Sequence, residues 1–229
     1  MSGASAARKK VLLSWSGGKD SAWALHVLRQ TPGLEVAALL TTINEHFSRV
    51  AIHGYRESLL DAQAEAAGLP VWKVPLPWPC SNADYESRMA EVCARAVRER
   101  FDAVAFGDLF LEDIRAYRLE RLAGTGLEPL FPVWGIPTDQ LARAMIAGGL
   151  SAHITCLDPR RLPASFCGRI FDATLLRDLP PEVAPCGERG EFHTFACAGP
   201  MFAHPIPVRH THSVERDEFV YGDLVLAEE

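Results

Sequence analysis

Three groups of residues in the chain combine glycine with charged or hydroxyl side chains in patterns suited to chemistry. The first is the segment 16–21, Ser-Gly-Gly-Lys-Asp-Ser, which lies between a short apolar stretch and a helical one. Two glycines let the backbone approach a ligand closely, and the first N–H groups of the following helix point into the turn. The segment predicts a phosphate loop, although an ordinary strand-to-helix turn capped by Asp20 or Ser21 would share its composition.

The second group follows the apolar segment 103–106. Gly107 permits close approach of a ligand, and Asp108 could hold Mg²⁺ or a cationic group of a substrate. Arg115 and Arg118 are three residues apart, so on a helix they share a face from which they could contact a phosphate or a carboxylate. The alternative for the two arginines is a charged, solvated helix surface.

The third group is the 187–194 loop, Gly-Glu-Arg-Gly-Glu-Phe-His-Thr. Its two glycines allow a tight turn, and Glu188 and Glu191 could present carboxylates to a metal ion, an ammonium ion or an amine. Taken alone, the segment could also be an acidic turn without function. His53, at the start of a helical segment, could orient a phosphate or a substrate acid, or could serve as a structural hydrogen-bonding group.

Alternating apolar and helical segments must position these groups. Apolar segments 11–13, 36–40, 71–74 and 103–106 each precede a helical pattern, which predicts a parallel sheet covered on both faces. Ligands bind beyond the carboxyl ends of such strands, where the first two groups lie. Near residue 137 the pattern changes to a Thr138-capped helix over 138–147, followed by short strands at 152–157, 192–197, 206–212 and 218–226. We therefore expect an α/β domain over 1–136 and a smaller α+β domain over 137–229.

Composition restricts the classes of protein that remain. The 229 residues, 48% of them hydrophobic, carry a net charge of −6, which fits a globular protein and disfavours a nucleic-acid partner bound through phosphate neutralisation. The six cysteines form no Cys-x-x-Cys pair, so neither a zinc site nor a thioredoxin-like redox pair is expected. No apolar run is long enough to span a bilayer or precedes the first strand, which predicts a cytoplasmic protein without a membrane partner.

The phosphate loop has neither the P-loop spacing Gly-x-x-x-x-Gly-Lys-Ser/Thr nor the dinucleotide-binding spacing Gly-x-Gly-x-x-Gly. It resembles the pyrophosphate loop of the ATP pyrophosphatases, which cleave ATP between its α- and β-phosphates. Together with Gly107-Asp108, Tyr117-Arg118-x-Glu120, Pro132-Val133-Trp134 and the 187–194 loop, it resembles the diphthine-ammonia ligase family. The resemblance implies an adenine nucleotide α-hydrolase-like fold, a five-stranded parallel sheet between helices, with a family-specific C-terminal domain.

The resemblance also implies a reaction, in which ATP is consumed with Mg²⁺, a carboxylate is amidated by ammonium, and AMP and pyrophosphate are released. The nucleotide is expected to contact Ser14, Ser16, Gly17, Gly18, Lys19, Asp20, Ser21, Leu40, Thr41, Gly107 and Asp108. Mg²⁺ would be held by Asp20 or Asp108. Residues expected to act in catalysis are Lys19, Asp20, Asp108, Glu188 and Glu191. Ammonium and the carboxylate acceptor are expected to contact His53, Arg115, Arg118, Gly187, Glu188, Gly190, Glu191 and Thr194.

One position departs from the family pattern and leaves the acceptor open. Members that make diphthamide on elongation factor 2 usually carry an acidic residue before the final threonine of the last motif, where this chain has His193. Segments 79–86 and 110–113 look more like those of bacterial relatives, so a corrinoid acid or another small metabolite is an alternative to a protein side chain. A module that binds ATP or AMP without turnover is a further alternative, and a homodimer is compatible with the sequence.

Overall fold

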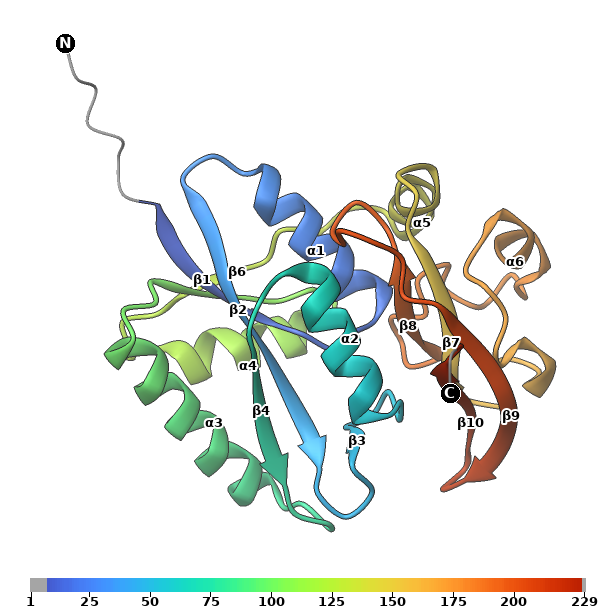
Figure 1. Cartoon of the computed structure of the whole chain (residues 1–229), viewed down its shortest axis with the longest axis horizontal. Coiled ribbons are helices and arrows are strands. Elements are labelled where there is room, and N and C mark those ends of the chain that lie inside the picture. The colour runs from blue at the N-terminus through green and yellow to red at the C-terminus, as the bar shows by residue number, and fades with distance from the viewer. Residues whose placement is uncertain (1–7, 228–229) are drawn as a thin grey trace.

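The computed structural model describes residues 8–227 as two sheets with helices around them (Figure 1). Five strands of the first sheet run parallel. The short strand β3 (Arg49–Val50) pairs antiparallel with the last two residues of β2 (Leu34–Asn44), Ile43 and Asn44. In spatial order the parallel strands are β4 (Val71–Leu76), β2, β1 (Lys9–Ser14), β5 (Ala103–Ala105) and β6 (Glu128–Leu130). The expected five-stranded parallel sheet is therefore confirmed, with β3 as an addition that the sequence did not indicate.

Helices cover both faces of this sheet, as Figure 1 shows. Two of them, α1 (Lys19–Gln30) and α2 (Glu57–Ala67), lie on one face, and α3 (Asn82–Arg98) and α4 (Glu112–Leu122) lie on the other. Successive side chains of a strand point to opposite faces, so Val11 and Leu13 join the core under α1 and α2 while Leu12 joins the core under α3. Burial on both faces of the sheet explains why residues 11–13 of β1 are all apolar.

The second sheet is antiparallel, and its strands in spatial order are β8 (Phe192–Ala198), β7 (Ser151–Leu157), β10 (Phe219–Leu226) and β9 (Val208–Arg216). It is accompanied by α5 (Thr138–Ala147), the short 3-10 helix η1 (Ala164–Phe166) and α6 (Ala173–Asp178). The separate α+β part is confirmed. The prediction of Thr138 as a helix cap was wrong by one position, because Pro137 is the N-cap residue and Thr138 is already helical. The proposed boundary at 136 falls in the connection between β6 and α5 and stays a prediction.

The two sheets share one apolar core. Trp15, directly after β1, packs edge to face on Phe202, which follows β8, with ring centroids 6.2 Å apart. Trp23 of α1 packs against Gly148 at the end of α5, where a Cβ would lie 2.5 Å from the indole ring. The start of α1 is thereby fixed relative to both sheets. The six cysteines are free thiols, and within residues 8–227 no helix is long and apolar enough to cross a membrane.

Candidate active site

A cavity of about 200 Å³ opens at the carboxyl ends of β1 and β5, where the strand order of the first sheet reverses. The 187–194 loop, which leads into β8 of the second sheet, closes its other side. The three groups of residues identified in the sequence thus meet around one cavity. The sequence-predicted residues that line it are Ser14, Ser16, Lys19, Asp20, Ser21, His53, Gly107, Asp108, Arg118, Gly187, Glu188 and Thr194.

The phosphate loop is folded by its own hydroxyl groups. The Ser21 Oγ donates to the carbonyl of Gly18 at 3.0 Å, so the Ser16 Oγ, 3.1 Å from it, is the donor between the two hydroxyls. In turn the N–H of Gly18 donates to the Ser16 Oγ at 3.3 Å. Gly17 has a φ of +74°, and a Cβ at this position would lie 2.0 Å from the Tyr55 hydroxyl, so both its conformation and its surroundings require glycine.

Side chains from α2 and its preceding turn hold the loop from behind. Gln63 is fully buried, and its Nε2 donates to the carbonyls of Gly17, at 2.9 Å, and Ala196 of β8, at 2.7 Å. Tyr55 donates its hydroxyl to the Ser16 carbonyl at 3.0 Å. Because these donors satisfy the outer face of the loop, its backbone keeps one conformation while its inner face remains toward the cavity.

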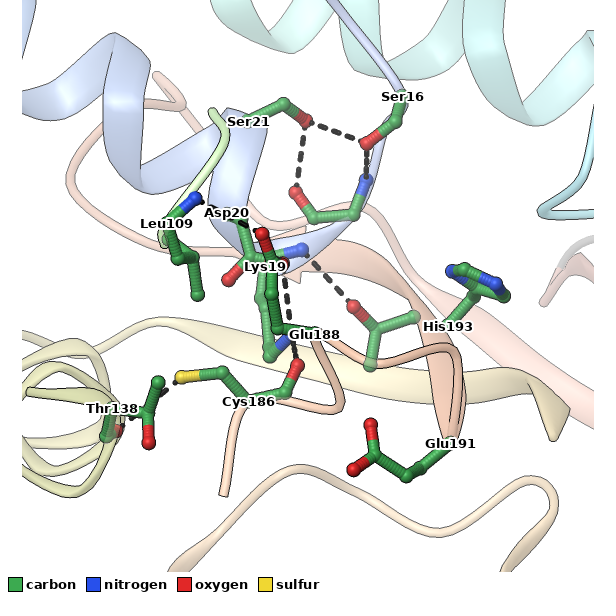
Figure 2. A network of polar contacts seen from close by, with 12 residues as sticks. Ser16, Lys19, Asp20, Ser21, Leu109, Thr138, Cys186, Glu188, Glu191 and His193 are labelled. Carbon is green, nitrogen blue, oxygen red and sulfur yellow. Dashed lines mark hydrogen bonds and ion pairs between the residues drawn. The ribbon is translucent and has the colours of Figure 1, made fainter. Parts of the chain in front are cut away.

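Lys19 and Asp20 carry opposite charges at the start of α1 (Figure 2). The Lys19 side chain is 2% exposed, its Nζ lies 2.8 Å from the Asp20 Oδ2, and it also donates to the carbonyl of Cys186. Burial lowers the pKa of Lys19, but the nearby carboxylates of Asp20 and Glu188 outweigh burial and raise it, so the amine is charged. The Asp20 Oδ1 is buried and has no hydrogen-bond partner among the described residues, which leaves an acceptor for a ligand.

Two further carboxyl groups in the cavity have perturbed acidities. Burial raises the pKa of Glu188 to about 7, although its Oε1 accepts a hydrogen bond from the N–H of Leu109 at 3.0 Å. Burial also raises the pKa of Asp108, against the opposing effect of Arg118, whose Nε lies 3.5 Å from the Asp108 Oδ2. A carboxyl group that titrates near neutral pH can both take up and release a proton, so Glu188 is suited to proton transfer.

Several predicted residues do not reach the cavity. Glu191 is fully buried, and its two carboxylate oxygens accept hydrogen bonds from the N–H groups of Ala184 and Arg189 at 3.1 and 2.8 Å. Figure 2 shows this carboxylate apart from Lys19 and Asp20. Glu191 therefore stabilises the backbone of its own loop and does not line the cavity.

The remaining predicted residues have other surroundings. The Arg115 guanidinium lies over the rings of Trp134 and Phe131, 4.8 and 5.4 Å from their centroids, and does not line the cavity. Thr41 donates its hydroxyl to the carbonyl of Trp15 at 2.7 Å, which holds β2 to the start of the phosphate loop. Gly190 is outside the cavity, with a φ of +81° that shapes the 187–194 loop.

An apolar groove of about 610 Å³ adjoins the cavity between α3 and α4. Phe106 and Arg118 line both spaces, and the Arg118 guanidinium lies 4.8 Å from the Phe106 ring centroid. Leu40 of β2 forms part of the floor of the groove, and Tyr85 and Met89 of α3 form part of one wall. A polar cavity and a larger apolar one therefore share two lining residues, an arrangement suited to a ligand with a charged end and a flat apolar end.

Four residues that line the cavity were not selected from the sequence as site residues: Phe106, Cys186, Phe192 and His193. All four are neighbours of residues that were selected, so a window of one position around each selected residue would have found them. Tyr55 and Gln63, which support the loop without lining the cavity, lie in an ordinary helical segment with no local signal.

Comparison with known families decides between the classes of phosphate loop. Residues 9–126 match the model of the diphthamide synthase N-terminal domain. The chain belongs to this family. The match includes the phosphate loop, Gly107 and Asp108 and ends before the 187–194 loop, and membership indicates an ATP-binding enzyme of the ATP pyrophosphatase type. No curated protein matches the chain.

Proposed function

We propose that this member of the diphthamide synthase family is an ATP-dependent ligase that adenylates a carboxylate and amidates it with ammonia, releasing AMP and pyrophosphate. The observation that carries the proposal is the meeting of the phosphate loop with Glu188, a carboxyl group with a pKa of about 7, in one cavity. The first feature suits cleavage of ATP and the second suits removal of a proton from an amine.

The two adjoining spaces suit the two ends of ATP. The β- and γ-phosphates would accept hydrogen bonds from N–H groups of the phosphate loop, with the positive end of the α1 dipole and Lys19 opposite their charge. The adenosine would occupy the apolar groove, against Leu40 and Phe106. Arg118, which lines both spaces, would then lie near the α-phosphate.

The chain also fits a magnesium ion brought with the nucleotide. Within residues 8–227 no three His, Cys, Asp or Glu side chains form a group that could hold a metal. Mg²⁺ does not need one, because it is commonly bound by one or two carboxylates together with substrate phosphates. Asp20, with its unpartnered buried oxygen, and Asp108 would supply these carboxylates. The ion would neutralise charge on the phosphates.

The chemistry then proceeds in two displacements. An oxygen of the acceptor carboxylate forms a bond to the α-phosphorus, and the bond to the bridging oxygen breaks as pyrophosphate leaves. Lys19 and the α1 N-terminus stabilise the charge that develops on pyrophosphate. Ammonia next forms a bond to the acyl carbon as the bond to AMP breaks, and the proton lost from nitrogen passes to Glu188.

Product analysis tests the proposal. The full chain is incubated with ATP, MgCl₂, ammonium chloride and individual carboxylic acids, and the nucleotides are separated by ion exchange. We expect AMP and pyrophosphate in equal amounts when both an active acid and ammonium are present, and a hydroxamate when hydroxylamine replaces ammonium. Formation of ADP and phosphate, or AMP release that needs no acid, would overturn the scheme.

A pair of variants adds a matched control. Asp20→Asn should abolish product formation because it removes a charge from the cavity. Asp139→Asn should leave turnover unchanged, since Asp139 occupies the first turn of α5 as Asp20 occupies that of α1, but is exposed and outside the cavity.

A further inference from the structure

Two histidines lie side by side at the edge of the candidate active site. His53 comes from the turn before α2, and His193 is the second residue of β8. Their ring centroids are 4.8 Å apart, and both side chains line the cavity with the phosphate loop. The proposed reaction gives neither imidazole a role.

His53 is locked in one tautomer against the loop. Its Nδ1 lies 3.2 Å from the carbonyl oxygen of Thr194, and because a carbonyl can only accept, Nδ1 carries the proton and Nε2 has a free lone pair. The Cε1 between these nitrogens would lie 3.0 Å from a Cβ placed on Gly18. The imidazole is therefore in contact with the backbone that would hold phosphate.

His193 is less constrained. Within residues 8–227 neither of its ring nitrogens has a hydrogen bond or ion pair, while the ring faces the cavity. The charged and titratable groups around the two rings are Lys19 and Asp20 from α1, Tyr55 beside His53, Asp108 and Arg118 after β5, and Cys186 and Glu188 across the cavity. Among the described residues, no carboxylate forms an ion pair with either ring.

This environment keeps both rings neutral when no anion is present. Burial, the neighbouring His193 and Lys19 lower the pKa of His53 to about 3, and burial and Lys19 lower the pKa of His193 to about 4. Neutral His193 offers one N–H donor and one acceptor, and neutral His53 offers only the acceptor at Nε2, whereas a phosphate needs donors. Negative charge placed near the pair would favour protonation, and mutual repulsion would limit the pair to one proton.

We propose that His193 contacts the phosphates of the nucleotide and takes up one proton when ATP or pyrophosphate binds, while His53, whose N–H is donated to Thr194, stays neutral beside it. The inference rests on the proposed function, because it requires phosphate in this cavity. His193 has the higher pKa of the two and receives the proton, which turns it into a double donor. Departure of pyrophosphate releases the proton again, so binding of this ligand tightens as the pH falls.

Calorimetry with inorganic pyrophosphate and MgCl₂ tests the inference at pH 6 in buffers that differ in ionisation enthalpy. The ligand's own protonation cancels when the wild-type protein is compared with His193→Asn. We expect the wild type to take up about one proton more than this variant and to bind roughly tenfold more tightly. His204→Asn, at an exposed histidine outside the cavity, should behave as the wild type.

The outcomes separate the two proposals. Pyrophosphate that fails to bind the wild-type protein would overturn both the proposed function and the role of the histidines. Binding with equal proton uptake in the wild type and His193→Asn would overturn the role of the histidines and leave the ligase proposal standing. Nitrogen-15 NMR of the imidazoles in the wild-type protein gives a second measurement independent of variant folding. The His193 ring should change from neutral to protonated on addition of pyrophosphate, and an unchanged ring would contradict the inference.

Discussion

The main-chain N–H of Lys19 donates a hydrogen bond to the side-chain oxygen of Thr194, with nitrogen and oxygen 3.0 Å apart. Lys19 is the first residue of α1, and Thr194 lies on β8 of the second sheet, 175 positions away. The N-cap residue, Gly18, has no side chain with which to satisfy this donor. The second sheet therefore supplies the cap that a helix normally takes from its own preceding residue, and it completes the phosphate loop.

Removing this cap should loosen the loop. Thr194→Val keeps the side-chain shape and removes the acceptor, and since Thr194 is 1% exposed, the donor would be left buried and unsatisfied. We expect the free energy of unfolding to fall by about 1–2 kcal/mol, measured by urea denaturation. Thr42→Val in β2 is the control, because the Thr42 hydroxyl forms no hydrogen bond within the described residues. Equal losses for the two variants would contradict the capping role.

Gly17 should tolerate no side chain. Gly17→Ala combines an unfavourable positive φ with a Cβ 2.0 Å from the Tyr55 hydroxyl, so the loop must shift. Gly33→Ala is a matched control, because Gly33 has a similar φ of +82° and no atom within 4 Å of the added Cβ. We expect Gly33→Ala to cost about 1–2 kcal/mol of unfolding free energy, the cost of the left-handed conformation, and Gly17→Ala to cost more and to abolish pyrophosphate binding. The two are compared by denaturation and calorimetry, and similar losses would exclude the steric explanation.

Arg115 and Arg118 of α4 should separate binding from stability. Arg118 lines the cavity and lies near Asp108, so Arg118→Ala should weaken ATP binding roughly tenfold through the loss of a charge-assisted contact with the α-phosphate. Arg115 instead lies over Trp134, so Arg115→Ala should leave the affinity within about twofold and lower the free energy of unfolding by about 0.5–2 kcal/mol. Calorimetry and urea denaturation of both variants decide the matter, and a larger affinity loss in Arg115→Ala would reverse the assignment.

The sequence predicted those features of the fold and the site that depend on short-range pattern. The apolar strands, the parallel sheet and the glycines beside strand ends follow from short-range pattern, and they bring Asp20, Asp108 and Glu188 to one cavity. The role of Gln63 was not predicted, because nothing in a helical segment indicates that its amide will donate to two carbonyls from distant parts of the chain. Long-range contacts of this kind depend on how the two sheets pack, which residue spacing does not encode.

Glu188 and Glu191 show most clearly that residue spacing does not determine which side chain faces the cavity. Both are glutamates of one loop, and their spacing suggested a shared role. Gly187 and Gly190, with φ values of +65° and +81°, turn the loop so that Glu188 faces the cavity and Glu191 faces the loop's own backbone. The structure thus assigns opposite surroundings to two identical side chains, and this difference can be measured.

Neutralising each glutamate should change stability in opposite directions. The pKa of Glu188 in the folded protein, about 7, lies above its ordinary value of 4.5, so its stabilising contribution is complete below pH 4.5 and is lost as the pH rises through 7. Glu188→Gln keeps an oxygen that accepts from Leu109 and carries no charge. At pH 8 this variant should be about 1–3 kcal/mol more stable than the wild type, while amide formation falls by about 10²–10⁴-fold.

Glu191→Gln should be destabilised, because both carboxylate oxygens of Glu191 accept main-chain N–H groups and the amide would place a donor against one of them. We expect a loss of about 1–3 kcal/mol at pH 8. Urea denaturation of the two variants and the wild type at pH 5 and pH 8 tests both signs. The gain for Glu188→Gln should shrink at pH 5, where the wild-type carboxyl group is largely protonated, and a gain of equal size at both pH values would show that its origin is not ionisation.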